Sequence, residues 1–203
     1  MEEKNTRLKI LKVATKLFAE YGFEGTSTRD ICKAANINIS LISYYFGGKE
    51  KLYDEIISDS VRKQNEFMER FIDINADISV LSFSEKINLL KLTLEKVIDY
   101  IFNEISRESL IIFLRRHQKT SHSQRFPLDD FLHKLVGAIL NKDKYSQDVV
   151  YAVLFLMSQI VFPFLVENSL LHLLQADSMN KIDTQKIKKH INNYIDQFFL
   201  NIN

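Results

Sequence analysis

The clearest structural signal in this chain is TSTRDICKAANINISLISYYFGGKEKLY, residues 26–53. Its periodicity predicts a short helix over residues 28–35 and a second over residues 39–46. Between them stands a tight polar turn at residues 36–38. Two short helices joined by such a turn are typical of a helix-turn-helix, which presents its second helix to the major groove of DNA. This stretch therefore predicts a DNA-binding head.

The ends of these two helices carry local signals. Ser27 and Asp30, three residues apart, form a capping box that predicts the start of the first helix. Ser40 is a candidate cap for the second helix, and Gly47 with Gly48 ends it. Gly22 similarly ends an earlier amphipathic helix. The capping pattern is therefore consistent with three helices in the head.

The rest of the chain also indicates helices. Glycine and proline together amount to seven residues, which leaves little room for hairpins, so we predict an all-α fold of about nine helices. The other predicted helices cover residues 6–21, 49–72, 84–103, 106–119, 128–141, 147–174 and 183–201. A kink is expected at Pro163. The predicted division is a DNA-binding head at residues 1–50 and a helical ligand-binding and dimerisation body at residues 51–203.

Exposed polar positions of the head are the candidate DNA contacts. Hydroxyl groups and the helix N-terminus suit phosphate, an arginine suits phosphate or guanine, and a leucine suits a thymine methyl group. The candidates are Thr28, Arg29, Asn38, Ser40, Leu41, Ser43, Tyr44, Tyr45 and Lys49. For any one of them the alternative is an ordinary solvated surface group.

Charge is distributed unevenly along the chain. The net charge is only +1, yet residues 1–49 hold eight lysines and arginines against five carboxylates, a net of +3. Residues 50–59 hold one lysine against four carboxylates, a net of −3. Positive charge thus coincides with the segment expected to face phosphate, although chance variation would give a similar split.

The motifs LFAEYGFEGTSTRDICKAANI and SLISYYFGGKEKLYDEI resemble the TetR family of transcriptional regulators, and the FGGKEKLY variant is similar to the CecR-like subgroup. The resemblance covers about the first 60 residues. It implies an all-helical homodimer that binds double-stranded operator DNA with its heads and a small-molecule effector in its bodies. The implied function is a repressor that its effector releases from a palindromic operator.

Helix three departs from the family pattern. Members often carry a tyrosine where Ser43 stands, and a lysine at or near the positions of Ile39 and Gly47. Fewer phosphate contacts are therefore expected from this helix. Tyr44, Tyr45 and Lys49 are expected to carry more of that role.

Two apolar helix faces in the body are candidate dimer surfaces, because two helices from each subunit would form a four-helix interface. The residues are Val150, Val153, Leu154, Met157, Ile187, Ile191, Tyr194, Ile195 and Phe198. The alternative is that both faces fill the core of the single chain.

Large apolar and aromatic side chains of the body are candidates for the effector pocket. They are Met68, Phe71, Phe102, Phe113, His117, Met157 and Phe162. Each of them equally suits an ordinary core position. Arg115, Arg116 and His117 follow an apolar run, where they suit an anionic group, an acidic neighbour or a solvated surface.

Enzyme classes find little support. The sequence has no GxGxxG, P-loop, HExxH or CxxC motif, so no cofactor and no metal are expected. The alternative reading is a helical interaction protein or ferritin-like metal enzyme with an accidental helix-turn-helix. No glutamate has a histidine three residues further on, as ferritin-like sites require.

The single cysteine and the charged N-terminus predict a cytoplasmic protein. The apolar stretch at 149–174 is interrupted by polar residues and a proline, among them Ser158, Gln159, Pro163, Glu167, Asn168 and His172, which favours a buried helix over a membrane span.

Overall fold

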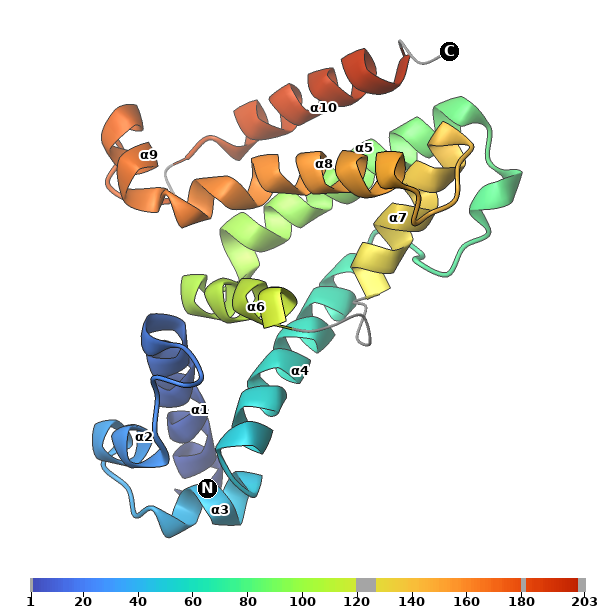
Figure 1. Cartoon of the computed structure of the whole chain (residues 1–203). Helices are drawn as coiled ribbons and strands as arrows, with labels where there is room; N and C mark the ends of the chain where they lie inside the picture. The colour runs from blue at the N-terminus through green and yellow to red at the C-terminus, as the bar shows by residue number, and fades with distance from the viewer. Residues whose placement is uncertain (1, 120–126, 180–181, 201–203) are drawn as a thin grey trace. The chain divides into compact units, whose positions relative to one another are not determined.

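The computed structural model describes residues 2–119, 127–179 and 182–200, and in these residues the fold is all-helical, as predicted (Figure 1). Ten α-helices occur in the described ranges, together with a 3₁₀ turn, η1 (Ile78–Val80), and a π-helical turn, η2 (Tyr100–Glu104). Most of the connection between the helices predicted at 106–119 and 128–141 lies outside the described residues. The chain forms two compact units.

The first unit contains the predicted head. It is built from α1 (Glu2–Tyr21), α2 (Thr28–Ala35), α3 (Ser40–Phe46) and α4 (Lys49–Met68) as far as Gln64, together with α6 (Arg107–Lys119). Its core is filled by fully buried apolar side chains from four helices. They are Ile10, Ala14 and Phe18 of α1, Ile31 and Ala35 of α2, Ile42 of α3 and Leu52 of α4.

Helix α6 belongs to this first unit although it comes late in the chain. It packs along α1, and Leu110 and Ile112 are buried. The Arg115 guanidinium donates a hydrogen bond of 3.1 Å to the backbone carbonyl of Phe18, near the end of α1. A cation at this end is favourable because the last carbonyls of a helix carry partial negative charge. The compact unit therefore extends beyond the head predicted at residues 1–50.

The second unit packs α5 (Phe83–Asp99) against α7 (Pro127–Leu140) and α10 (Thr184–Leu200), with α8 (Gln147–Leu165) against α7. Ser82 and Glu85 form a capping box that starts α5. Gly137 permits the turn after α7 to fold back, since a Cβ there would lie 3.0 Å from the Lys142 carbonyl oxygen. Ion pairs between Lys91 and Asp196, and between Lys188 and Asp99, join α5 to α10.

One predicted helix is two helices. We expected a single kinked helix over residues 147–174, but α8 ends at Leu165 and α9 (Glu167–Leu174) follows Val166. Pro163 lies in the last turn of α8 and has no N–H to donate, so the helix is weakened where it ends. The expected helix over 84–103 likewise gives way to η2 after Asp99. Its α-helical hydrogen bonding therefore stops about one turn early.

Candidate nucleic-acid interface

The capping box predicted for α2 is confirmed. The Ser27 hydroxyl accepts from the Asp30 N–H at 3.1 Å, and the Ser27 N–H donates to the Asp30 carboxylate at 2.9 Å. Hydrogen bonds from the Ser27 hydroxyl and the Ser27 backbone N–H lower the pKa of Asp30 below its ordinary value. The box therefore keeps a negative charge in the first turn of α2, where helix geometry favours it.

The α2–α3 turn is closed by a different side chain from the one expected. The Asn38 Oδ1 accepts from both the N–H and the hydroxyl of Ser40, each at 2.9 Å. Asn36 takes the left-handed conformation, with φ of 49°. Ser40 is the first residue of α3, and the helix has no side-chain cap, since Ile39 stands at the N-cap position. The cap expected from Ser40 is therefore wrong, and Asn38 holds the turn before the helix instead.

The outer surface of α3 carries polar and aromatic groups. Ser43 and Tyr44 are exposed, and Tyr44 keeps 71% of its surface accessible. Tyr45 is half-buried, and its ring meets that of Tyr44 edge-on with centroids 4.9 Å apart. Leu41 is also half-buried. Of the two tyrosines, Tyr44 is therefore the more exposed to solvent.

Helix α2 adds a cationic group to this surface. Arg29 is exposed and Thr28 is half-buried at the helix start. Lys33, one turn after Arg29, is exposed as well. Lys33 was not among the residues predicted to contact DNA, although its four-residue spacing from Arg29 places the two side chains on the same side of α2.

Lys49 differs from the other candidates because its amine is engaged inside the head. Its Nζ donates to the backbone carbonyls of Phe23 at 3.0 Å and Thr26 at 3.1 Å. The same nitrogen lies 4.0 Å from the centroid of the Phe23 ring. The expected phosphate contact stays a prediction, and these contacts indicate a different use of this lysine.

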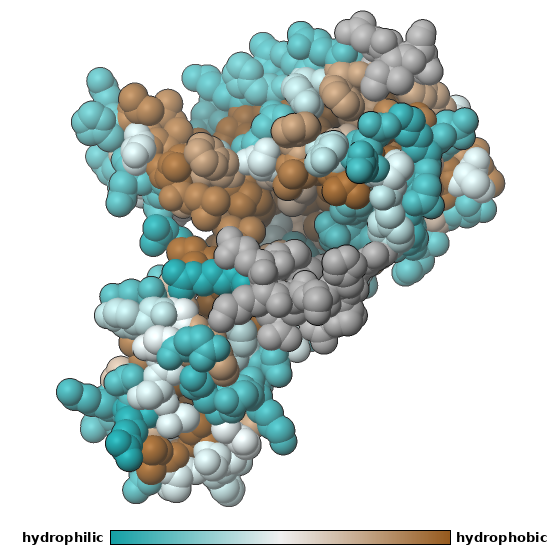
Figure 2. All heavy atoms as spheres, viewed as in Figure 1, coloured by the Kyte–Doolittle hydropathy of each residue, from teal (hydrophilic) through white to brown (hydrophobic). Residues whose placement is uncertain are grey.

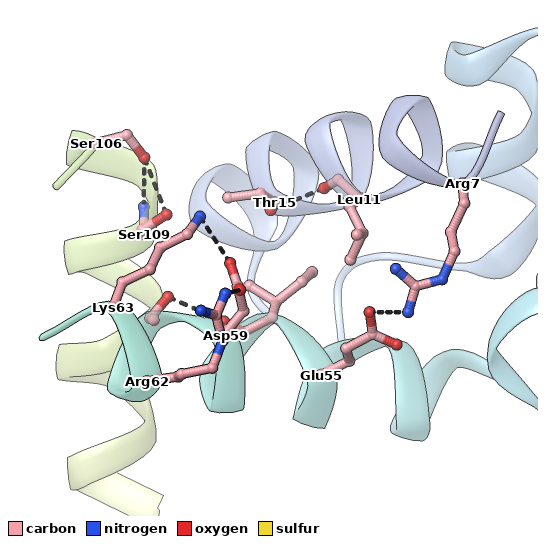
Figure 3. Close-up of polar contacts among 11 residues, drawn as sticks. Arg7, Leu11, Thr15, Glu55, Asp59, Arg62, Lys63, Ser106 and Ser109 are labelled. Atoms are coloured by element: carbon pink, nitrogen blue, oxygen red, sulfur yellow. Dashed lines mark hydrogen bonds and ion pairs between the residues drawn. The ribbon is translucent and has the colours of Figure 1, made fainter. Parts of the chain in front are cut away.

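The inner face of the head holds α3 in place. Ile42 and Phe46 are buried, and the Arg7 guanidinium lies 5.1 Å from the centroid of the Phe46 ring. Arg7 also pairs with Glu55, which joins α1 to α4 (Figure 3). Cys32 is buried, and burial raises the pKa of its thiol. Ala34 of α2 is exposed.

The candidate dimer residues divide into two groups. Val153, Ile191 and Ile195 are buried within the single chain, with at most 3% of their surface exposed, so they fill its own core. Ile187, Met157, Tyr194 and Phe198 are half-buried. Only Val150 and Leu154 of the predicted set are exposed.

Helix α8 carries further exposed apolar residues beside those two. They are Tyr151, Phe155, Phe162 and Leu165, and each has more than half of its surface accessible. We call these four residues, with Val150 and Leu154, the α8 apolar face. Figure 2 shows hydrophobic residues gathered on the surface in the region of α8 and α9. Only about one-third of the most apolar part of α8 is buried, so the prediction of a buried helix is only partly confirmed.

The candidate effector residues lie in different environments. Met68 and Phe102 are buried, and Phe102 meets Phe164 with ring centroids 4.8 Å apart. Phe71 is partly exposed beneath the Lys96 amine. Phe162 belongs to the α8 apolar face. Phe113 lies on α6 in the first unit, and the side chain of His117 lies outside the described residues. The second unit thus holds Met68, Phe71, Phe102, Met157 and Phe162.

The head described above is a helix-turn-helix of the kind found in DNA-binding regulators. The profile "Bacterial regulatory proteins, tetR family" matches residues 10–56. The profile "HTH-type transcriptional dual regulator CecR, C-terminal domain" matches residues 90–200, more than half of the chain. The chain belongs to the TetR family of transcriptional regulators, and its body is CecR-like.

Individual relatives agree with this family. The chain is 27% identical to the dual regulator CecR of Shigella flexneri over 92% of its own length and 88% of that protein. It is 28% identical to the probable regulator YttP of Bacillus subtilis strain 168, over 70% of this chain. That match spans 60% of YttP. A shorter match, 44% identical to the repressor NicS of Pseudomonas putida, spans 24% of that protein.

Solved structures share the fold. The hemolysin II regulator HlyIIR, in a mutant form, matches with a TM-score of 0.59 and 22% identity over 94% of this chain and 96% of that one. AibR, solved with isovaleryl coenzyme A and operator DNA, matches with a TM-score of 0.61 and 16% identity over 96% and 98%. At these identities the likeness supports the architecture of head and body.

Proposed function

We propose that this chain is a transcriptional repressor that binds a roughly palindromic operator as a homodimer and is released by a small-molecule effector. The observation that carries the proposal is the exposed polar surface of α2 and α3, mounted on a head whose helix starts are fixed by side-chain hydrogen bonds. Family membership supports this use of the head. Action on operator DNA would place the protein in the cytoplasm.

Within this surface we assign the main DNA contacts to Arg29, Ser43 and Tyr44. All three are exposed. An arginine reaches phosphate or a guanine edge, and hydroxyl groups bind phosphate oxygens. We assign supporting contacts to Thr28, Leu41 and Tyr45, which are half-buried. Asn38 and Ser40 bond one another, so their proposed contribution is to shape the start of α3.

We propose that the dimer forms through the α8 apolar face. An exposed apolar stripe of this kind is a common mark of a protein interface. The buried side of the same helix already packs on α7, so its outer side remains available. The same feature explains why Gln147–Leu165 is apolar and long enough to cross a membrane by composition alone, a property shared with helices of soluble proteins.

We propose that the effector binds in the second unit. AibR, of similar fold, was solved with an acyl-coenzyme A and operator DNA, and KstR2 of Mycobacterium tuberculosis is described as a ketosteroid regulator. Those ligands belong to those proteins, and they support only the general class of small-molecule response. The effector would act by binding the DNA-competent conformation less tightly than the other.

The DNA contacts are tested by fluorescence anisotropy on a duplex selected from a random library. Arg29→Ala and Tyr44→Ala should each weaken binding by about 5- to 150-fold, the range expected for loss of about 1–3 kcal/mol. Matched controls are Lys16→Ala and Tyr21→Ala on α1, which remove the same kinds of side chain from exposed positions. Unchanged affinity in both head variants would show that this surface does not contact DNA.

A further inference from the structure

The Lys49 amine occupies a small cage in the turn that precedes α2. Two backbone carbonyls, those of Phe23 and Thr26, accept its hydrogen bonds, and the face of the Phe23 ring lies 4.0 Å away. The Phe23 ring itself rests on Tyr53 of α4, with centroids 5.0 Å apart. A charged amine makes stronger hydrogen bonds than a neutral donor does. The same positive charge is also attracted to the face of an aromatic ring.

The turn that Lys49 contacts is also held by the hydrogen bonds of Thr26. The single proton of the Thr26 hydroxyl is shared between the carbonyls of Leu17 at 3.1 Å and Gly22 at 2.8 Å, and only 1% of Thr26 is exposed. Thr26 also stands directly before Ser27, which caps α2. The carbonyl that receives the lysine therefore belongs to a fixed point at the start of the helix-turn-helix.

The other end of the contact lies just after the recognition helix. Lys49 is the first residue of α4, and only Gly47 and Gly48 separate it from the end of α3. Both residues have positive φ, 74° and 129°, which glycine adopts because it has no side chain. The backbone of this joint is therefore not restrained by side chains of its own. The contacts of Lys49 therefore hold the C-terminal end of α3 close to the N-terminal end of α2.

We propose that Lys49 is a positioning residue that clamps the α1–α2 turn to the start of α4 and so sets the angle of α3 for DNA, instead of binding a phosphate itself. The inference rests on the proposed function, because the angle matters only if α3 enters a groove. It assigns Lys49 a role opposite to the phosphate contact expected from its place in the sequence.

The two roles differ in their dependence on salt. Log affinity falls with log salt concentration, and each lost phosphate contact reduces the steepness of that fall by about 0.9. If Lys49 only clamps the head, its loss leaves the number of phosphate contacts in the bound state unchanged. Binding becomes weaker because the head must then be ordered when it binds DNA. Lys49→Met should therefore weaken binding with little change in slope, and Lys49→Arg, which restores charged donors, should recover part of the affinity.

The experiment compares the wild-type protein, Lys49→Met, Lys49→Arg and the control Lys51→Met at a temperature where all are folded. Lys51 is an exposed lysine of the same helix, so the control removes the same charge close by. Affinity for a selected duplex is measured across a salt series, and hydrogen–deuterium exchange follows the amides of residues 22–28. We expect about tenfold weaker binding at constant slope, and faster exchange in this turn, for Lys49→Met alone.

Three outcomes would overturn the proposal. A slope less steep by about 0.9 or more per head identifies Lys49 as a phosphate ligand. Faster exchange with unchanged affinity makes the clamp purely structural. Unchanged exchange of residues 22–28 in Lys49→Met would show that Lys49 does not hold this turn. If the wild-type protein selects no duplex, the proposed function fails and the positioning role fails with it, while the exchange data still report whether the clamp exists.

Discussion

Polar side chains of the head serve two purposes that the sequence does not distinguish. Asn38 and Lys49 look like surface groups beside a helix-turn-helix, yet both bond within the head. The reason is that a lysine amine ends a flexible stem, so its direction depends on which acceptors the fold brings near. The carbonyls of Phe23 and Thr26 come close to the Lys49 amine only in the folded head, across more than 20 residues of sequence. Arg29 and Tyr44, by contrast, are exposed as their positions predicted.

The capping box should make the stability of the head depend on pH through Asp30. Its pKa is lowered in the folded chain, so its contribution is present above the ordinary value of 3.8 and is lost as pH falls below that value. We expect the difference in urea midpoint between the wild-type protein and Asp30→Asn to shrink on acidification from pH 7 to pH 3. A difference that grows toward low pH would contradict this assignment.

At the scale of elements, local signals predicted the short helices well and the long apolar helix poorly. The capping box fixed the start of α2, and Gly22 and Gly47 stand where α1 and α3 end. Helix α8 is apolar on most sides, so periodicity cannot tell its buried side from its exposed one. That choice is made by packing on α7, which leaves Leu154 and Phe155 outside while Val153 is buried.

The joint after α3 should tolerate only residues that adopt the left-handed conformation. Gly47 has φ of 74° and caps α3 through its N–H to the Ser43 carbonyl. Gly47→Val should lower the free energy of unfolding by about 1–2 kcal/mol, since the left-handed region is costly for a β-branched residue. Gly47→Asn is the matched control and should cost clearly less, because asparagine accepts this conformation. Equal losses in urea denaturation would contradict the backbone explanation.

The α8 apolar face should control association. Leu154→Glu and Phe155→Glu place charges on it and should raise the dimer dissociation constant at least about tenfold, measured by sedimentation equilibrium. Val80→Glu is the control, since Val80 is an exposed apolar residue of η1 and does not belong to the α8 apolar face. An unchanged mass for both α8 variants would exclude this face. Deleting α10 is a poorer test because Ile191, Ile195 and Phe199 are buried in the core.

At the scale of the whole molecule, the all-α fold followed from the scarcity of glycine and proline, and the family followed from the head. The extent of the first compact unit did not, because α6 joins α1 from more than 80 residues away in the sequence. The functional boundary predicted at residue 50 stays a prediction. The same long-range contact puts Arg115 beside Phe18, which no local pattern indicates.

In the proposed function, two copies of this head read two related half-sites on DNA. Sequencing duplexes that the purified protein selects from a random library tests it most directly. We predict enrichment of two inverted half-sites whose centres lie about 10–10.5 base pairs, or a multiple of that, apart. Arg29→Ala and Tyr44→Ala should lose the enrichment. Selection of no common sequence by the wild-type protein, or of a single half-site without an inverted copy, would contradict the account.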